Sequence, residues 1–232
     1  MVLFFWYSNL YGSENMINEE LKKYIEEKVF PIYKNNERGH NIDHIMYVIN
    51  RSLKFAKTID NINYNMVFTI AAYHDIGHYI DAKNHEKISS EILLNDNNLK
   101  RFFTEEEIKI MAEAVCDHRA SKNEEPRSIY GKIVSSADRN TIVNEAIKRT
   151  YYYRLKHSPE KSLEEIIEES RHHLLEKFGK NGYATEKMYF VDEDYILFLD
   201  NITELTSNKE IFRDYYLSII NLESLHNKQN KM

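Results

Sequence analysis

The sequence predicts an all-α fold, and two observations support this prediction. Only six glycines and three prolines occur among 232 residues, so few positions interrupt a helix. Apolar residues recur at steps of three and four rather than alternating, which is the helical period. We therefore expect a helical bundle followed by a C-terminal helical lobe, with almost no room for strands.

Helix boundaries are expected to within a few residues. Thr104 is followed three positions later by Glu107, which predicts a capping box at a helix start. Pro126 suits the first turn of another helix. The expected helices are 15–34, 42–59, 64–76, 85–95, 105–118, 127–138, 140–157, 162–177, 193–206 and 209–226.

The stretch from Phe178 to Asp192 carries two glycines and loses the helical period. It predicts a long loop or a short hairpin. We expect an N-terminal helical segment over 1–39 that packs on the core, a core domain over 40–160 and a C-terminal lobe over 161–232. The apolar opening "MVLFFWY" is too short to span a membrane and is expected to pack on the body.

Composition and charge narrow the class of protein. A hydrophobic content of 42% in 232 residues suits one domain, or one domain with a modest lobe. The net charge of -6 argues against a nucleic-acid polymer as partner. The single cysteine, Cys116, excludes an internal disulfide, is expected in the core and favours a cytoplasmic protein. High Asn, Lys, Ile and Tyr usage suggests a bacterial source.

Histidines and aspartates recur near the ends of apolar helical stretches. Burying such groups without a partner is costly, so something must compensate them. Metal sites need imidazoles and carboxylates that converge from different elements, because one helix presents only two or so ligands on a face. The set is His44 in "HNIDHIMYVINRS", His74 and Asp75 in "AAYHDIGH", His85 in "NHEKISSEIL", His118 in "EAVCDHR" and Asp138 in "IVSSADRNT". The adjacent His-Asp doublet favours a metal over a catalytic dyad.

These motifs, in this order, resemble the H…HD…D signature of the HD-domain superfamily of metal-dependent phosphohydrolases. "AAYHDIGH" is similar to the family's "aalLHDIGK", "HIMYVI" resembles its first motif helix, and "SADR" resembles the helix that carries its last aspartate. The resemblance covers roughly residues 40–145. It implies the HD-domain helical bundle, and the chain is most similar to small stand-alone bacterial HD hydrolases, some of which cleave nucleotides.

The resemblance also implies a set of side chains that bind one or two divalent ions, with Mn²⁺, Fe²⁺, Mg²⁺ or Ni²⁺ as the expected metals. The first ion takes the motif residues His44, His74, Asp75 and Asp138. His85 and His118 match two further histidines of dinuclear members, in which Asp75 or a hydroxide bridges the ions. The alternatives are a helix-start position for His85 and a dipole-favoured helix end for His118. His40 is expected to cap a loop or to contact a ligand rather than the metal.

The implied activity is hydrolysis of a phosphomonoester or of a nucleotide's phosphate chain by a metal-activated water. Asp75 would orient the water, and His78, His118 or a second water would protonate the leaving oxygen. Arg139, Lys83 and Arg119 would bind phosphate oxygens. His78 stands where the family has a lysine. The sequence "GYA" at 182–184 resembles the GYP motif of the cyclic-di-nucleotide phosphodiesterases, but it follows Asp138 instead of preceding it, so this subfamily is excluded.

Two other functions fit the same ligands. One is a di-iron, O₂-activating oxygenase of the HD fold, and the other is a non-catalytic nucleotide-binding sensor. The expected partner is a small-molecule phosphate ester or nucleotide, with no nucleic-acid polymer and no membrane; a homodimer is compatible with the sequence. His172 and His173 are interpreted as part of a solvated helix face rather than a phosphate pocket.

Overall fold

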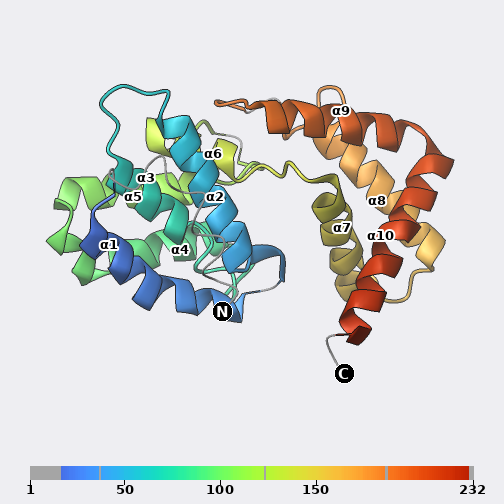
Figure 1. The fold of residues 1–232 in the computed structure, drawn as a ribbon, viewed down its shortest axis with the longest axis horizontal. Coiled ribbons are helices and arrows are strands. Elements are labelled where there is room, and N and C mark those ends of the chain that lie inside the picture. The colour runs from blue at the N-terminus through green and yellow to red at the C-terminus, as the bar shows by residue number, and fades with distance from the viewer. Residues whose placement is uncertain (1–16, 37, 123, 186–187, 230–232) are drawn as a thin grey trace. The chain divides into compact units, whose positions relative to one another are not determined.

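The computed structural model describes residues 17–36, 38–122, 124–185 and 188–229, with side chains as far as residue 221. These residues form helices joined by turns and contain no strand, so the all-α prediction is confirmed (Figure 1). The opening "MVLFFWY" lies outside the described residues. The elements are α1 (Glu19–Tyr24), η3 (Ile25–Val29), η4 (Phe30–Asn35), η5 (Arg38–His40), α2 (Ile42–Ala56), α3 (Tyr64–Tyr73), α4 (His85–Leu94), η6 (Asn97–Arg101), α5 (Glu105–Asp117), α6 (Ile129–Ala137), α7 (Val143–His157), α8 (Leu163–Phe178), α9 (Glu193–Ser207) and α10 (Lys209–Gln229).

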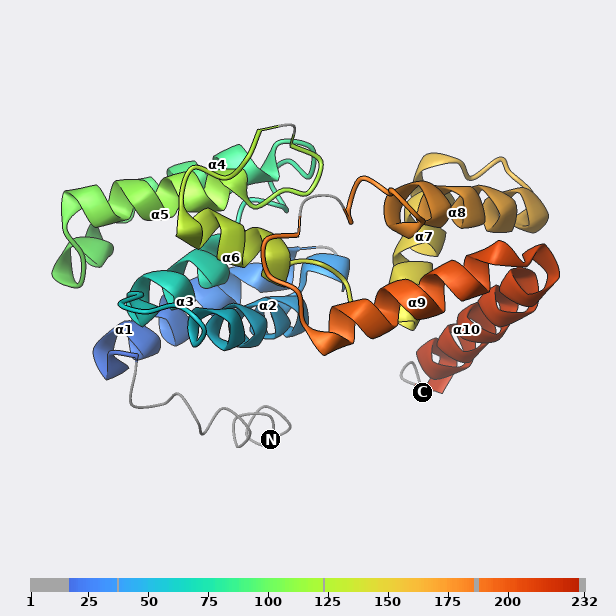
Figure 2. The same ribbon diagram turned by 90° about the horizontal axis from the view of Figure 1, so that it is seen from above.

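The chain divides into two compact units, Met1–Asp138 and Arg139–Met232. Figures 1 and 2 show α1 to α6 in the first unit and α7 to α10 in the second. The sequence predicts a domain boundary after residue 160, which would assign α7 to the first part. In the structure α7 packs with the C-terminal helices, because its residues Ala146 and Ile147 are buried in their core.

In the first unit, α3 is the central helix. All of its residues from Met66 to Tyr73 are buried, which explains the continuous apolar run "MVFTIAAY". Helices α2, α5 and α6 pack on it. The hydroxyls of Tyr24 and Tyr73 both donate to Asp96, each at 2.5 Å, and so join α1 to α3.

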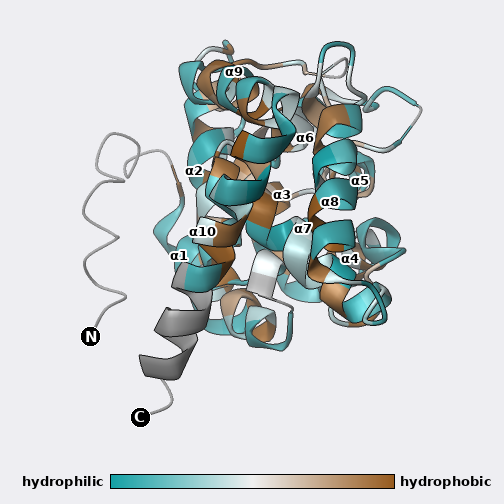
Figure 3. Cartoon of the chain, turned by 90° about the vertical axis from the view of Figure 1, so that its right-hand side faces the viewer, coloured by the Kyte–Doolittle hydropathy of each residue, from teal (hydrophilic) through white to brown (hydrophobic). Residues whose placement is uncertain are grey.

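The second unit has an aromatic core to which all four of its helices contribute. The rings of Phe178 and Phe198 meet edge to face at 4.8 Å, and Phe212 and Tyr216 are fully buried. Figure 3 shows hydrophobic and hydrophilic residues along the same helices, as amphipathic packing requires. Between α8 and α9 the described residues form turns without a strand, so this connection is the long loop rather than the hairpin.

Several local expectations are corrected. The expected helix over 15–34 is α1 followed by a π turn and a 3-10 turn, and Pro31 lies where the helical geometry changes. Helix α6 begins at Ile129 with Ser128 as its cap, so Pro126 precedes the helix. Cys116 is partly exposed rather than part of the core. The capping box of Thr104 and Glu107 is confirmed.

None of the helices in the described part of the chain is long and apolar enough to cross a membrane.

Candidate metal centre

The predicted ligands lie at the ends of five helices of the first unit. His44 is in the first turn of α2, where the Asn41 side chain caps the helix by accepting from the His44 backbone N–H at 3.3 Å. His85 is the first residue of α4. The others directly follow a helix: His74 and Asp75 follow α3, His118 follows α5 and Asp138 follows α6. Short side chains at helix ends can therefore reach one common point.

The turn after the doublet packs tightly on α4. The backbone N–H of Gly77 donates to Ser89 Oγ at 2.9 Å. A Cβ atom on Gly77 would lie 2.7 Å from Ile88 Cγ2 and 2.9 Å from the Ser89 backbone nitrogen. No side chain fits at this position, and the close approach brings His85 of α4 to the doublet.

Four side chains meet in what we call the first half of the centre: His44, His74, Asp138 and the Oδ2 atom of Asp75. The Nε2 atom of His44 lies 3.1 Å from Asp138 Oδ1 and 3.5 Å from Asp75 Oδ2. The Nε2 atom of His74 lies 3.4 Å from both His44 Nε2 and Asp75 Oδ2. The ligand atoms of His44, His74 and Asp138 lie within 4.8 Å of one another, as those of a single cation do, and His40, His44 and Asp75 form a second such group.

The second half consists of His85, His118 and the Oδ1 atom of Asp75. The two Nε2 atoms are 3.3 Å apart and lie 3.2 Å and 3.5 Å from Asp75 Oδ1. This oxygen is buried and accepts no hydrogen bond. Asp75 thus presents one oxygen to each half and joins them.

Backbone carbonyls orient three of the imidazoles. Because a carbonyl oxygen only accepts, the ring nitrogen Nδ1 carries the hydrogen and Nε2 faces the centre. Histidines that bind metals in proteins are held in this way. The three contacts are His74 to Ala71 at 2.8 Å, His85 to Ala82 at 2.9 Å and His118 to Val115 at 2.6 Å. Imidazole nitrogens and carboxylate oxygens therefore converge in a buried place, and this donor set fits a divalent cation.

The two halves differ in electrostatics. Burial alone would lower the pKa of His74, but the Asp75 and Asp138 carboxylates outweigh it and raise that pKa to about 9. Burial likewise disfavours the charged form of Asp138, yet the hydrogen bond and charge of His44 hold its pKa far below the usual range. In the second half, burial lowers the pKa of His85, and neighbouring His118 adds to the effect. The first half attracts a positive charge more strongly.

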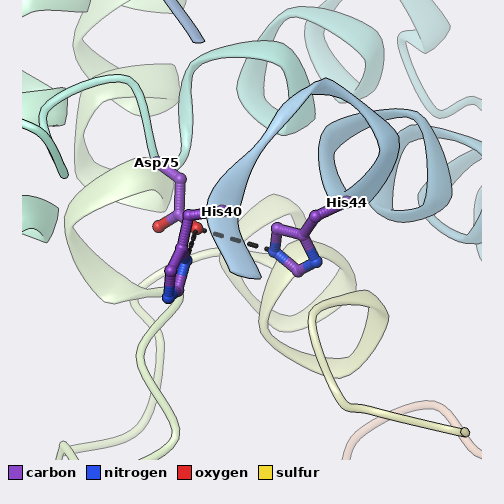
Figure 4. A group of neighbouring side chains, drawn as sticks. All are labelled: His40, His44 and Asp75. Atoms are coloured by element: carbon purple, nitrogen blue, oxygen red, sulfur yellow. Dashed lines mark hydrogen bonds and ion pairs between the residues drawn. The ribbon is translucent and has the colours of Figure 1, made fainter. Parts of the chain in front are cut away.

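Two further histidines line the doublet. His78, predicted as a proton donor, is buried and stacks on His40 with ring centroids 3.8 Å apart. Nδ1 of His40 lies 2.6 Å from Asp75 Oδ2, the oxygen that also faces His44 (Figure 4). His40 thus contacts a predicted ligand, one of the two roles expected for it.

The predicted phosphate-binding residues are placed differently. Arg119 donates from Nη1 to the Lys83 carbonyl at 2.6 Å and to Glu86 Oε2 at 3.2 Å, while the Lys83 side chain is exposed. Arg119 and Glu86 directly follow His118 and His85 in sequence, so this pair borders the second half. Arg139 is buried and is the first residue of the second unit. Its role toward a phosphate stays a prediction.

Sequence reasoning missed Arg51. This buried arginine donates from Nη1 to the carbonyls of Ser136 at 3.2 Å and Ala137 at 3.3 Å. It therefore neutralises the C-terminal end of α6, directly before Asp138. The available signal was its position seven residues, or two helical turns, after His44 on an otherwise apolar face.

Comparison with known families identifies this region. Residues 41–141 match the family model of the HD domain. This region is an HD domain. The resemblance seen in the sequence motifs is confirmed. The searches found no matching curated protein and no matching solved structure.

Proposed function

We propose that this HD-domain protein is a metal-dependent phosphohydrolase that acts on a phosphomonoester or on the phosphate chain of a nucleotide. The observation that carries the proposal is the position of Asp75. Its Oδ2 lies among His44, His74 and Asp138, and its Oδ1 lies between His85 and His118. A carboxylate that joins two buried donor groups in this way fits two divalent cations side by side.

His44, His74, Asp75 and Asp138 would hold the first ion, and His85, His118 and Asp75 the second. Imidazole and carboxylate donors suit Mn²⁺, Fe²⁺, Mg²⁺ or Ni²⁺. When bound, such ions lower the pKa of a water and neutralise charge on phosphoryl oxygens.

The protein's own side chains would orient the water, protonate the leaving oxygen and bind the phosphate. Asp75 would orient the water, which loses one proton to solvent before its oxygen bonds to phosphorus, and the bond from phosphorus to the leaving oxygen would break as that oxygen takes up a proton. Of the two histidines predicted as proton donors, His118 has Nδ1 engaged by Val115 and Nε2 turned to the centre. His78 is therefore the better donor to the leaving oxygen. Lys83 and Arg119, at the border of the second half, and Arg139 are proposed to bind the other phosphate oxygens.

A substrate screen tests this proposal. Purified protein is first loaded with each metal and its metal content measured, and phosphomonoesters and nucleotides are then assayed for phosphate release. We expect turnover that is lost on chelation and absent in the Asp138→Asn variant. Metal-loaded protein without turnover of any compound in either class would overturn the proposal.

The same screen separates the alternatives. Iron-loaded protein that consumes O₂, with a substrate-dependent change in its optical spectrum, would indicate the di-iron oxygenase instead. Tight nucleotide binding without hydrolysis would indicate the sensor. A hydrolase works equally well without O₂, so one anaerobic assay distinguishes the first two functions.

A further inference from the structure

The segment from Phe30 to His40 precedes the matched HD domain, which begins at residue 41. Three of its side chains nevertheless contact the doublet and its turn. The first is Tyr33, which is fully buried and donates its hydroxyl to the Ala72 carbonyl at 2.8 Å. Ala72 lies two residues before His74, so this bond fixes the end of α3 from which the doublet emerges.

The second side chain is Asn36, whose amide makes three hydrogen bonds. Nδ2 donates to the carbonyls of Asp75 and His40, both at 3.0 Å, and Oδ1 accepts from the Tyr79 backbone N–H at 3.0 Å. Both amide hydrogens and the amide oxygen are thus used. Asn36 joins η5 to the doublet turn at two points of that turn.

The third side chain is His40. Its Nδ1 lies 2.6 Å from Asp75 Oδ2, and because an ionised carboxylate only accepts, Nδ1 is the donor. The face of the His40 ring stacks on His78 with an interplanar angle of 19°. Figure 4 shows the ring of His40 beside Asp75, on the oxygen that also faces His44.

The carboxylate of Asp75 needs such a partner. Rotation of an aspartate carboxylate about χ2 is soft, because this torsion has no sharp staggered minima. Asp75 serves both halves only while Oδ1 and Oδ2 keep their present directions. Of the three imidazole nitrogens near Oδ2, Nδ1 of His40 lies closest, at 2.6 Å against 3.4 Å for His74 and 3.5 Å for His44, so His40 is the group best placed to fix the rotation.

We propose that Tyr33, Asn36 and His40, which precede the HD domain, are part of the metal centre. Asn36 holds the turn that carries Asp75, and His40 is a positioning residue that donates to Oδ2 and fixes the carboxylate between the two halves. This inference rests on the proposed function only in that the centre binds a metal; it does not depend on hydrolysis.

The test compares Mn²⁺ binding by calorimetry, and the visible absorption of bound Co²⁺, in three variants. His40→Ala removes the donor, His40→Asn keeps an N–H at nearly the position of Nδ1, and His172→Ala changes an exposed histidine of the second unit. We expect His40→Ala to weaken Mn²⁺ binding roughly 10- to 100-fold and to alter the Co²⁺ spectrum. His40→Asn should recover most of the affinity, and His172→Ala should match the unchanged protein.

Two results would overturn the role of His40: unchanged affinity in His40→Ala, or a folded His40→Asn that binds as weakly as His40→Ala. The role of Asn36 is tested without metal, since Asn36→Ala should speed hydrogen exchange at the Tyr79 amide. Unchanged exchange there would contradict it. If the unchanged protein binds no metal, the proposed function fails, whereas the exchange measurement still decides whether Asn36 holds the turn.

Discussion

The two halves of the metal centre share Asp75 but differ in charge. The first half contains a second carboxylate, Asp138, and raises the pKa of His74 to about 9. The second half has one oxygen and two imidazoles, and the pKa of His85 is lowered by burial and by its neighbour His118. Two groups of similar ligands can therefore differ in how strongly they attract positive charge, depending on the number of carboxylates and on burial. We expect the first half to bind its ion more tightly.

Asp75→Ala is expected to have the largest effect, because it removes the only carboxylate that both halves share. Metal content should fall in both halves and phosphate release should drop to background. The fold should persist if its stability does not depend on the metal. Metal analysis with a turnover assay, and circular dichroism as the control for folding, checks this. Ordinary turnover by the variant would show that the doublet is misinterpreted.

Substitutions confined to one half test the difference in affinity directly. His85→Ala and His118→Ala should each leave one tightly bound ion per chain, whereas Asp138→Asn should weaken the tighter ion. Metal stoichiometry is measured under limiting and excess Mn²⁺. If both histidine variants keep the original stoichiometry under excess Mn²⁺ while activity falls, the two histidines act on the substrate or on a proton, and the second half is not a metal site.

Gly77→Ala tests how the second half is kept close to the doublet. The added Cβ would meet Ile88 and the backbone of Ser89, so α4 must shift and carry His85 with it. We expect a loss of about 1–3 kcal/mol in the free energy of unfolding, measured in urea. Mn²⁺ binding should weaken in the second half more than in the first. Ser89→Ala keeps the spacing but leaves the buried Gly77 N–H without its acceptor, so it should cost about 1–3 kcal/mol.

Much of this architecture is encoded locally and was predictable. Helix periods and the capping box at Thr104 depend on residues a few positions apart, and the doublet with its flanking apolar run marks one helix end. The sequence predicts one helix over 15–34, whereas in the structure the helical geometry changes next to Pro31. Contacts across long sequence distances were not predictable: Asn36 with Asp75, and Arg51 with the end of α6. No local pattern encodes them.

The division of the chain into two units after Asp138 likewise depends on long-range contacts that local sequence does not predict. Helix α7 has the period of a helix, but its partners are set by which surfaces its apolar residues meet. Ile147 is buried with the aromatic side chains of the C-terminal helices rather than with the HD domain. Sequence periodicity shows that a helix has an apolar face, whereas the partner of that face depends on tertiary packing.

The last comparison is the pH dependence of the metal-free protein, in which the two halves should act in opposite directions. The pKa of His74 is raised from 6.5 to about 9, so its contribution to stability is complete below pH 6.5 and is lost as the pH rises through 9. The pKa of His85 is lowered from 6.5, so its charged form is favoured by unfolding, and stability is lost as the pH falls below 6.5. Melting temperatures between pH 5 and 10 in the presence of a chelator would measure both trends.

Two variants assign these trends to their residues. His74→Gln should flatten the decline on the alkaline side, and His85→Gln the decline on the acid side, because glutamine does not titrate. His172→Ala again serves as the control on an exposed surface. If His74→Gln keeps the full alkaline decline, the carboxylates of the first half do not hold a proton on His74. The contrast in charge between the halves, and the tighter first ion inferred from it, would then lose its electrostatic basis.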